Sequence, residues 1–447
     1  MTRFALLLAA CLAAFALPAG AWSNHSLLSY RAFEAMPEVA NAAPVVVEPL
    51  EAFLKAQEPA LAELLERQEQ WARANMPQYA PRSDALQFKA DPGRSDAQRR
   101  EAFVRALRIS PLSRFALYLQ PDPRSSASPA PLLAHDGVNF LPEQPGDKQK
   151  FLPIAAQDKV SALAVLASAS DEPDYGLDIN LWQDSPSDWG KQYGFGPLPF
   201  GNPALYFATQ APFHMGFYHQ SWLIYKAAPF IQRTYPLMRI QQYSSLAALA
   251  FRSGHAYWGW RFTGLALHYI QDLTQPYHAD LAPGDSTLKL ISANTLAMAG
   301  FPGWRDDLIV LLSNRHLALE KFQNALMLAN ARAGKDTALE QALRRTERDA
   351  TYPAWSELYA RDTVSLEAHA GSARTVDTIV ATIPAHLVSD PKFDFGVNEA
   401  RIDLLAEIDR FGAGKRATLE AMVAELMGHA GAHSRNTVRG VLKAAGR

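Results

Sequence analysis

Hydrophobic and polar residues recur with a helical period along most of this chain. The pattern predicts a long helix over Leu246–Thr274, which Pro276 ends because a proline disfavours helical backbone in the residue before it. Leu50–Ala74 is rich in Ala, Leu, Glu and Gln and predicts a helix with a break or kink at Pro59. Further helices are expected over Ser29–Met36, Ser95–Ile109, Val160–Ser168, Trp304–Ala333, Asp336–Thr351, Ala354–Ala370, Ala373–Ile383, Val397–Phe411 and Lys415–Ala430. Strand-like alternation is scarce, so the predicted fold class is all-α.

Two stretches depart from the helical pattern. Residues 121–157 are dense in Pro, Ser, Asp and Gly and predict a long loop. Residues 191–235 hold twelve aromatic side chains, and Gly and Pro interrupt them, which favours irregular backbone. These aromatics either pack over a helical core or form the wall of a cleft for an apolar or planar substrate.

The first residues have the pattern of a secretory signal peptide. Arg3 supplies the positive charge, Phe4–Leu17 the apolar segment, and Ala19-Gly20-Ala21 the small residues of a cleavage site. Cleavage there makes Trp22 the first mature residue. The alternative is a lipoprotein box, Leu8-Ala9-Ala10-Cys11, which would make Cys11 the lipidated N-terminus, but its apolar segment would be short. We therefore expect a signal peptide over 1–21 and an exported protein, periplasmic or extracellular.

Composition restricts the chemistry available to the mature protein. Cys11 is the only cysteine, so disulfides and thiolate ligands are excluded after cleavage, and stability must come from the core or from bound metal. Lys and Arg number 43 against 45 Asp and Glu, which gives no electrostatic footprint for duplex nucleic acid. No later apolar run reaches ~18 residues, so no transmembrane segment is expected.

The most informative motif is HxxxDxxxxxH, formed by His268, Asp272 and His278. Residues four apart on a helix share one face, which places His268 beside Asp272. His278 follows the break at Pro276 and is free to point back toward them. Two imidazoles and a carboxylate suit Zn²⁺. The competing interpretation is that His268 packs in the core and Asp272 faces water.

A second pair of this kind lies downstream. His316 and Glu320 are again four apart, on a strongly helical segment. Such pairs arise by chance in a chain of this composition, and His386 with Asp390 is an example, because Pro391 disfavours helix there. We interpret that third pair as a decoy.

The order of these features resembles one known family. The chain has, in this order, an N-terminal mature Trp, a nearby His, a region with Asp and His, the motif HxxxDxxxxxH and the motif HxxxE. Gln275-Pro276 stands before the last His of the central motif. Together these features resemble the zinc-dependent phospholipase C and S1/P1 nuclease superfamily. The resemblance implies a multi-helix phospholipase C/P1 nuclease-like bundle with three Zn²⁺ in one cleft. It implies one domain over 22–447, with a helical and loop insertion at about 45–155 and a helical C-terminal extension after about 330. The segment Pro49–Ser125 in that insertion is interpreted as scaffold, with a lid or a partner-binding hairpin as alternatives.

The resemblance also assigns metal ligands. For the first zinc it implies Asp174 and His214, together with the central pair, and it leaves Asp171 and His219 as alternatives. For the second zinc it implies the following residues: His278, His316 and Glu320. For the third it implies the following groups: the free amine and carbonyl of Trp22, His25, and Asp272, which would bridge two metals.

Mechanism and substrate follow from the same resemblance. Asp174 would both ligate zinc and help to orient or deprotonate the attacking water, and no nucleophilic side chain is required. Glu320 in the HxxxE pair and Tyr175, at a position that contacts the lipid head group, favour a phospholipase C. His25 stands where phosphatidylcholine-preferring members carry Glu, which argues against choline specificity. The alternatives are a single-strand nuclease or 3′-nucleotidase, whose bases would stack on the aromatics of 191–235, and a non-catalytic helical protein with structural histidines. The sequence leaves the oligomeric state open.

Overall fold

The computed structural model describes residues 22–125, 131–143 and 149–447, and helices dominate there. The expected signal peptide (1–21), with its alternative at Cys11, lies outside the described residues. Within them, strands are limited to two antiparallel pairs of two residues each, β1 (Val45–Val46) with β4 (Lys159–Val160) and β2 (Tyr118–Leu119) with β3 (Leu152–Pro153). The all-α prediction is confirmed.

The helices and helical turns of the first half are α2 (His25–Phe33), α3 (Pro37–Ala40), α4 (Leu50–Ala56), α5 (Glu58–Asn75), η1 (Asp84–Leu86), α6 (Asp96–Leu107), η2 (His135–Gly137), α7 (Ala162–Ser170), η3 (Glu172–Tyr175), α8 (Asp188–Tyr193), α9 (Tyr206–His214), α10 (Trp222–Ala227), η4 (Pro229–Gln232) and α11 (Pro236–Arg252). Those of the second half are α12 (Ala256–Leu273), α13 (Pro276–Ala279), α14 (Thr287–Met298), α15 (Gly303–Arg332), α16 (Ala338–Arg344), η5 (Asp349–Thr351), η6 (Ala360–Val364), α17 (Ser365–Ala370), α18 (Ser372–Thr382), α19 (Ala385–Val388), α20 (Phe395–Asn398), η7 (Glu399–Arg401), α21 (Leu404–Phe411) and α22 (Lys415–Ala444).

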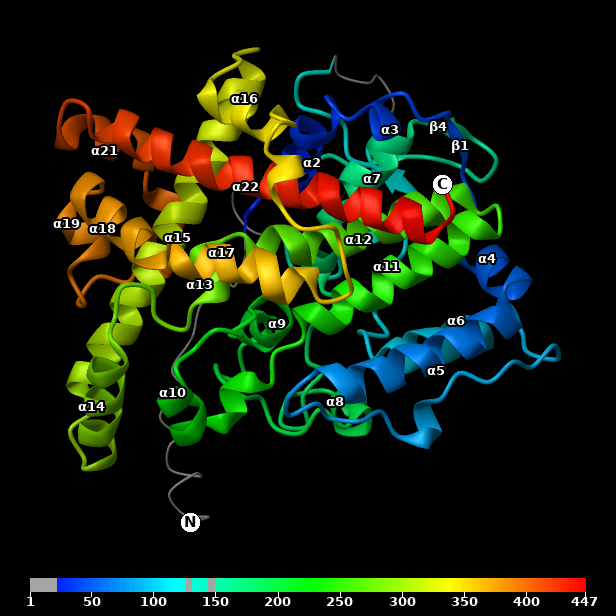
Figure 1. Ribbon diagram of the computed structural model, residues 1–447, viewed down its shortest axis with the longest axis horizontal. Coiled ribbons are helices and arrows are strands. Elements are labelled where there is room, and N and C mark those ends of the chain that lie inside the picture. The colour runs from blue at the N-terminus through cyan, green and yellow to red at the C-terminus, as the bar shows by residue number, and fades with distance from the viewer. Residues whose placement is uncertain (1–21, 126–130, 144–148) are drawn as a thin grey trace.

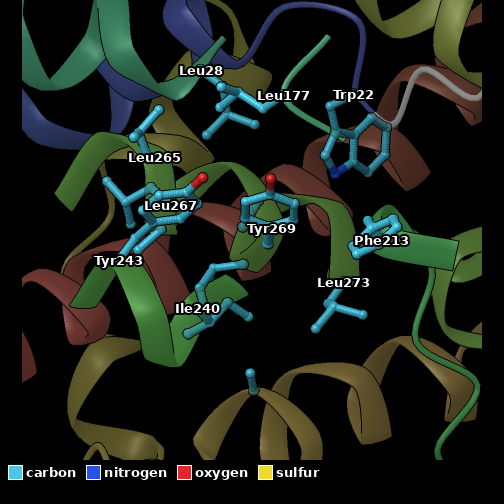
Figure 2. Close-up of a cluster of buried hydrophobic side chains, with 14 of the residues drawn as sticks. Trp22, Leu28, Leu177, Phe213, Ile240, Tyr243, Leu265, Leu267, Tyr269 and Leu273 are labelled. Carbon is cyan, nitrogen blue, oxygen red and sulfur yellow. The ribbon is translucent and has the colours of Figure 1, made fainter. Parts of the chain in front are cut away.

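Helix α12 is the centre of the molecule. All of its residues from Tyr257 to Leu273 are buried, the polar ones included, so the helix is covered on every side. It packs against α11, α7 and α22, and the last of these crosses the front of the molecule in Figure 1. Figure 2 shows side chains of α12 and α11 meeting in the core, with Trp22 and Phe213 in the same cluster. Polar residues on α12 are therefore held in a rigid, dry surrounding.

A glycine brings α7 close to α12. A Cβ atom built on Gly264 would lie 2.4 Å from the carbonyl oxygen of Leu166 and 2.6 Å from the Cβ of Ala169. No larger residue fits at this distance without a shift of backbone. The close approach fixes the end of α7, where the carbonyl of Ser170 accepts a hydrogen bond from His268 Nδ1 at 2.8 Å. The packing of α7 against α12 at Gly264 thereby orients His268, which lies one turn further along α12.

The predicted helices are confirmed in outline, but one prediction joins two helices. The helix expected over Leu246–Thr274 is wrong as a single element, because α11 ends at Arg252 and α12 begins at Ala256. Gly254, with φ +86°, turns the chain between them. The break expected near Pro59 is confirmed, since α4 ends at Ala56 and α5 opens with Pro59 in its first turn.

Several boundaries after residue 286 also differ from the prediction. Helix α14 was not expected, and α22 runs fourteen residues beyond its expected end at Ala430, to Ala444. The helix predicted over Asp336–Thr351 stops at Arg344, and the one predicted over Ala354–Ala370 has helical backbone only from Ala360. Short helices depend on packing more than on propensity, and packing partners are invisible in a local pattern.

Much of the aromatic segment 191–235 packs in the hydrophobic core. The rings of Phe195, Phe213 and Tyr235 pack on one another with centroids 5.0–5.4 Å apart. The segment also contains α9 and α10, so the expectation of irregular backbone holds only in part. The expected loop at 121–157 has only η2 and β3 in its described residues. Among the described residues, no helix has both the length and the apolarity needed to cross a membrane.

Candidate metal centre

Three buried groups of histidines and carboxylates face one another near the end of α12. Each offers ligand atoms within 4.8 Å of one another, and each could hold a metal ion. The groups are His25, His268 and Asp272; Asp174, His214 and His268; and His278, His316 and Glu320. Every side-chain ligand expected from the sequence belongs to one of them.

The pair predicted on one helical face is formed. His268 Nε2 lies 3.4 Å from Asp272 Oδ2, one turn apart on α12. His214, the last residue of α9, brings its Nδ1 to 2.9 Å from the same Asp272 oxygen and 2.9 Å from His268 Nε2. Asp174 Oδ1, on η3, lies 3.6 Å from His268 Nε2. Three elements that are distant in sequence thus direct four ligand atoms to one place.

The other oxygen of Asp272 faces the N-terminal segment. His25, the first residue of α2, places its Nε2 3.3 Å from Asp272 Oδ1. Trp22 is fully buried, and its indole Nε1 donates to Thr274 Oγ1 at 3.0 Å. Asp272 therefore has His25 at one carboxylate oxygen and His214 with His268 at the other, the position expected of a bridging residue.

A third set of ligand atoms lies around α13 and α15. His316 Nε2 is 2.6 Å from Glu320 Oε1 across one turn of α15. His278 Nε2 lies 3.2 Å from His316 Nε2 and 3.7 Å from Glu320 Oε1. Gln275 begins the single-turn helix α13 by accepting the Tyr277 backbone N–H on Oε1, and its Nε2 donates to Glu320 Oε1 at 3.3 Å. The break predicted at Pro276 thus turns His278 back toward His316 and Glu320.

The hydrogen bonds behind the imidazoles fix their tautomers. A carbonyl oxygen only accepts, so the ring nitrogen that contacts one must carry the proton. His268 Nδ1 donates to Ser170 O at 2.8 Å, and His278 Nδ1 donates to His214 O at 3.0 Å. His25 Nδ1 donates to Gln271 Oε1 at 2.8 Å, because the amide nitrogen of Gln271 is used toward Ser29. In all three rings the Nε2 lone pair faces the centre, the arrangement of metal-binding histidines.

Burial shifts the titration of every group in the centre toward its neutral form. Desolvation lowers the pKa of His25 to about 3 and that of His316 to about 3. It raises the pKa of Glu320 to about 8, and burial with the nearby charge of Asp174 raises the pKa of Asp272 well above its ordinary value. The carboxylates can therefore be ionised here, beside unprotonated imidazoles, only where a cation compensates their buried charge.

The centre fits divalent cations by its geometry as well as by its charge. His25 Nε2, His214 Nε2 and Asp272 Oδ1 are buried without a hydrogen-bond partner. Four ligands ~2.0–2.1 Å from a tetrahedral zinc are ~3.3 Å from one another. The distances between ligand atoms here, from 2.6 to 3.9 Å, lie around that value. Imidazole and carboxylate donors without thiolate also suit zinc.

A supporting layer was not expected from the sequence. Asp178 Oδ2 lies 3.7 Å from His214 Nε2, and the buried Arg239 and the Tyr269 hydroxyl hold the Asp178 carboxylate at 2.7 Å and 2.5 Å. Asp178 follows Asp174 by four residues, which is the one local signal that pointed to it. Arg239 is sixty-one residues further on, and no spacing links it to the motif.

Asp171 and His219, the alternative ligands that the sequence left open, contact other residues. Asp171 accepts hydrogen bonds from the Ser26 backbone and from Gln120. His219 contacts the carbonyl of Arg361, and neither residue belongs to a group of possible ligands. Asp174 and His214 are the residues that the structure brings to the centre.

Two further expectations concern single side chains. The Tyr175 hydroxyl donates to Gln120 Oε1 at 2.7 Å within a small apolar cluster with Tyr118 and Phe151. Its substrate-binding role stays a prediction. His386 packs near Phe393, and Asp390 caps the backbone of Lys392. The interpretation of that pair as a decoy agrees with this placement, since neither residue joins a ligand group among the described residues.

Comparisons with protein-family models, with curated proteins and with solved structures found no match to this chain.

Proposed function

We propose that this protein is an exported zinc-dependent phosphodiester hydrolase of the phospholipase C/P1 nuclease type, acting on phospholipid head groups. The observation that carries the proposal is the convergence of Nε2 lone pairs from His25, His268 and His278 on buried carboxylates. Such a set is suited to several cations in one cleft. Zn²⁺ bound there would polarise the phosphoryl oxygens, lower the pKa of a water molecule toward ~7 and stabilise the leaving oxygen.

Asp174 has the position of a general base. Its side chain is 26% exposed, whereas those of His214, His268 and Asp272 are fully buried. Burial, with the charge of Asp171 adding to it, raises the pKa of Asp174 well above the ordinary carboxylate value. Asp174 is the least buried residue of its ligand group, so its carboxylate is the one that an attacking water could reach.

The frame around Asp174 holds that carboxylate in place. Glu172, two residues earlier on η3, forms a buried ion pair with Arg261 of α12 at 2.7 Å. The pair fixes η3 against the helix that carries His268 and Asp272. The chain itself thus orients the base, buries the deeper groups and keeps the Nδ1 protons of His25, His268 and His278 directed away from the facing ligand atoms.

The first test compares substrates and metal content on the mature protein without a tag. We expect about three zinc ions per chain, hydrolysis of phospholipid to diacylglycerol and a phosphorylated head group, and a mature N-terminus at Trp22 by mass spectrometry. Phosphatidylcholine, phosphatidylethanolamine and single-stranded nucleic acid are assayed side by side. Activity on nucleic acid alone would replace the phospholipase by the nuclease, and less than one zinc per chain would favour a non-catalytic protein.

The second test isolates Asp174. Replacing it as Asp174→Asn should lower the rate at saturating substrate by roughly 100-fold or more, as expected for a lost base, while the protein stays folded. Asp188→Asn, on an exposed carboxylate of α8, is the matched control and should leave the rate unchanged. Full activity and full metal content in Asp174→Asn would show that the assignment is wrong.

A further inference from the structure

The region beside the third ligand group carries an unusual concentration of exposed apolar side chains. We define the apolar tip as residues 221–228 and 285–307, which comprise α10, α14 and the beginning of α15. Leu288 is 72% exposed, Phe301 70% and Trp222 68%. The tip also exposes Leu223, Leu296 and Trp304. In Figure 1, α10 and α14 extend together from the lower left of the molecule. Exposed apolar groups gathered in one place indicate an interaction surface.

An apolar cavity lies between the same helices. Its volume is about 170 Å³, and its walls include Ile224, Ile231, Leu281, Leu290, Ile291 and Leu312. Exposed residues such as Ala227 line it too, so it reaches the surface. Apolar cavities near ~150 Å³ stay dry and accept hydrocarbon ligands. This one has room for a segment of an aliphatic chain.

The cavity adjoins the metal centre. Leu312 precedes His316 by one turn of α15, about 6 Å along the helix axis. Leu281, which also lines the cavity, follows His278 by three residues. A molecule whose polar group reaches the third ligand group therefore has an apolar wall within reach of its hydrocarbon part.

The charges of the tip indicate which lipid surface it matches. It contains three cations and three anions, namely Lys226, Lys289, Arg305, Asp285, Asp306 and Asp307. Lys289 pairs with Asp285, and Arg305 pairs with Asp306. The Lys226 ammonium lies 5.7 Å from the Trp222 ring centroid. The balance offers no attraction to an anionic surface, while aromatic rings with polar neighbours suit the boundary between water and a lipid layer.

From these observations we infer that the apolar tip docks on a zwitterionic lipid surface and that its cavity receives one hydrocarbon chain of a lipid held there. The inference deepens the proposed function and rests on it only for the identity of that lipid as the substrate. Docking itself requires no hydrolysis. A second copy of this chain would be a different occupant, and the test separates it from lipid.

Vesicle binding is measured on Asp174→Asn protein, because the loss of the base keeps the lipid intact. Phosphatidylcholine vesicles should sediment with this protein, with little effect of added anionic lipid or of salt. Replacing the two aromatics together, as Trp222→Ser with Phe301→Ser, should weaken binding at least tenfold, because each ring loses its burial in the lipid. Phe411→Ser removes an exposed aromatic of α21 and should bind as before.

The cavity is tested with 1-decanol, which has no phosphate to compete for metal. Calorimetry should give one binding site per chain, and Ala227→Trp, which fills the cavity from its exposed side, should abolish it. Each of three results would overturn the inference. The Asp174→Asn protein does not bind vesicles, the double variant binds them within twofold of that protein, or Ala227→Trp leaves decanol binding unaffected. A dimer in sedimentation velocity that the double variant dissociates would overturn it too. Intact docking with no phosphoester hydrolysis by the native enzyme would instead refute the proposed function alone.

Discussion

At the scale of single residues, Asp272 is the side chain on which the centre depends most. One of its oxygens faces His25, and the other faces His214 and His268. Asp272→Asn keeps the shape and removes the charge that two of the proposed metal ions would share. We expect the variant to retain at most one zinc of three and to lose at least ~100-fold in rate, since even residues behind the ligands are worth 10–100-fold.

Metal analysis of the purified variant checks this expectation. Asp390→Asn is a matched control, because Asp390 also follows a histidine by four residues but caps a backbone N–H instead. The control should keep its full metal content. An Asp272→Asn protein with three zinc ions would show that the carboxylate does not bridge.

Glu320 gives a pH-dependent prediction for the metal-free protein. Its pKa is raised by burial from 4.5 to about 8 in the folded state. Below pH 4.5 both states hold the proton, and as pH rises toward 8 the unfolded state releases it while the folded state retains it. Glu320 therefore contributes stability at low pH that is lost through this window, on the order of a few kcal/mol.

Thermal melts of chelated protein at pH 5 and pH 8 test the sign. Glu320→Gln removes the titration, so its melting temperature relative to the native chain should rise between the two values. Comparing the variant with the native chain cancels the opposite contribution of His25 and His316, which favours higher pH. A difference that shrinks toward pH 8 would contradict the argument.

At the scale of elements, the contact of α7 with α12 couples stability to metal binding. Gly264→Ala places a methyl group against the Leu166 carbonyl, and overpacking of this kind costs about 1–3 kcal/mol. The shift of α7 should also weaken the bond from His268 to Ser170, so zinc affinity should fall together with stability. Denaturant unfolding and a competition titration with a chelator measure the two effects.

Gly428→Ala is the control for this prediction. Gly428 also lies inside a helix, α22, but its added Cβ would meet its nearest neighbours at 3.7 Å, an ordinary contact. That variant should be unchanged or more stable by roughly 0.5–1 kcal/mol, because alanine favours helix over glycine. Equal losses in both variants would show that the close approach has no special role.

The helices also show which parts of the candidate site could be predicted from the sequence. Spacing within one helix placed His268 beside Asp272 and His316 beside Glu320, because four residues make about one turn. It could not place Asp178 behind His214, since that contact depends on Arg239 and on how α11 packs. Helix α14 was missed for a related reason: its main neighbours are α15 and α10 at the molecular edge, and it shows no buried stripe, with Ala293 its one buried residue.

At the scale of the whole molecule, the metal centre joins segments from His25 to Glu320, and its ligands lie on α2, η3, α9, α12, α13 and α15. Without cations, this junction is a set of buried polar atoms, several of them unpaired. A ligand that binds only the folded state stabilises it by about 4 kcal/mol when present at ~1,000 times its Kd. Three such ions would contribute a large part of the stability of the fold.

Removing metal should therefore lower the melting temperature by at least roughly 10 °C and should loosen α2 and α15, which carry the ligand residues His25, His316 and Glu320. Scanning calorimetry before and after dialysis against a chelator measures the first effect, and hydrogen exchange of these helices measures the second. Zn²⁺ added back should restore both, whereas Ca²⁺ should not, because it prefers oxygen ligands to imidazole. A fully chelated protein that melts at the native temperature would mean that the core around α12 holds these helices together by itself.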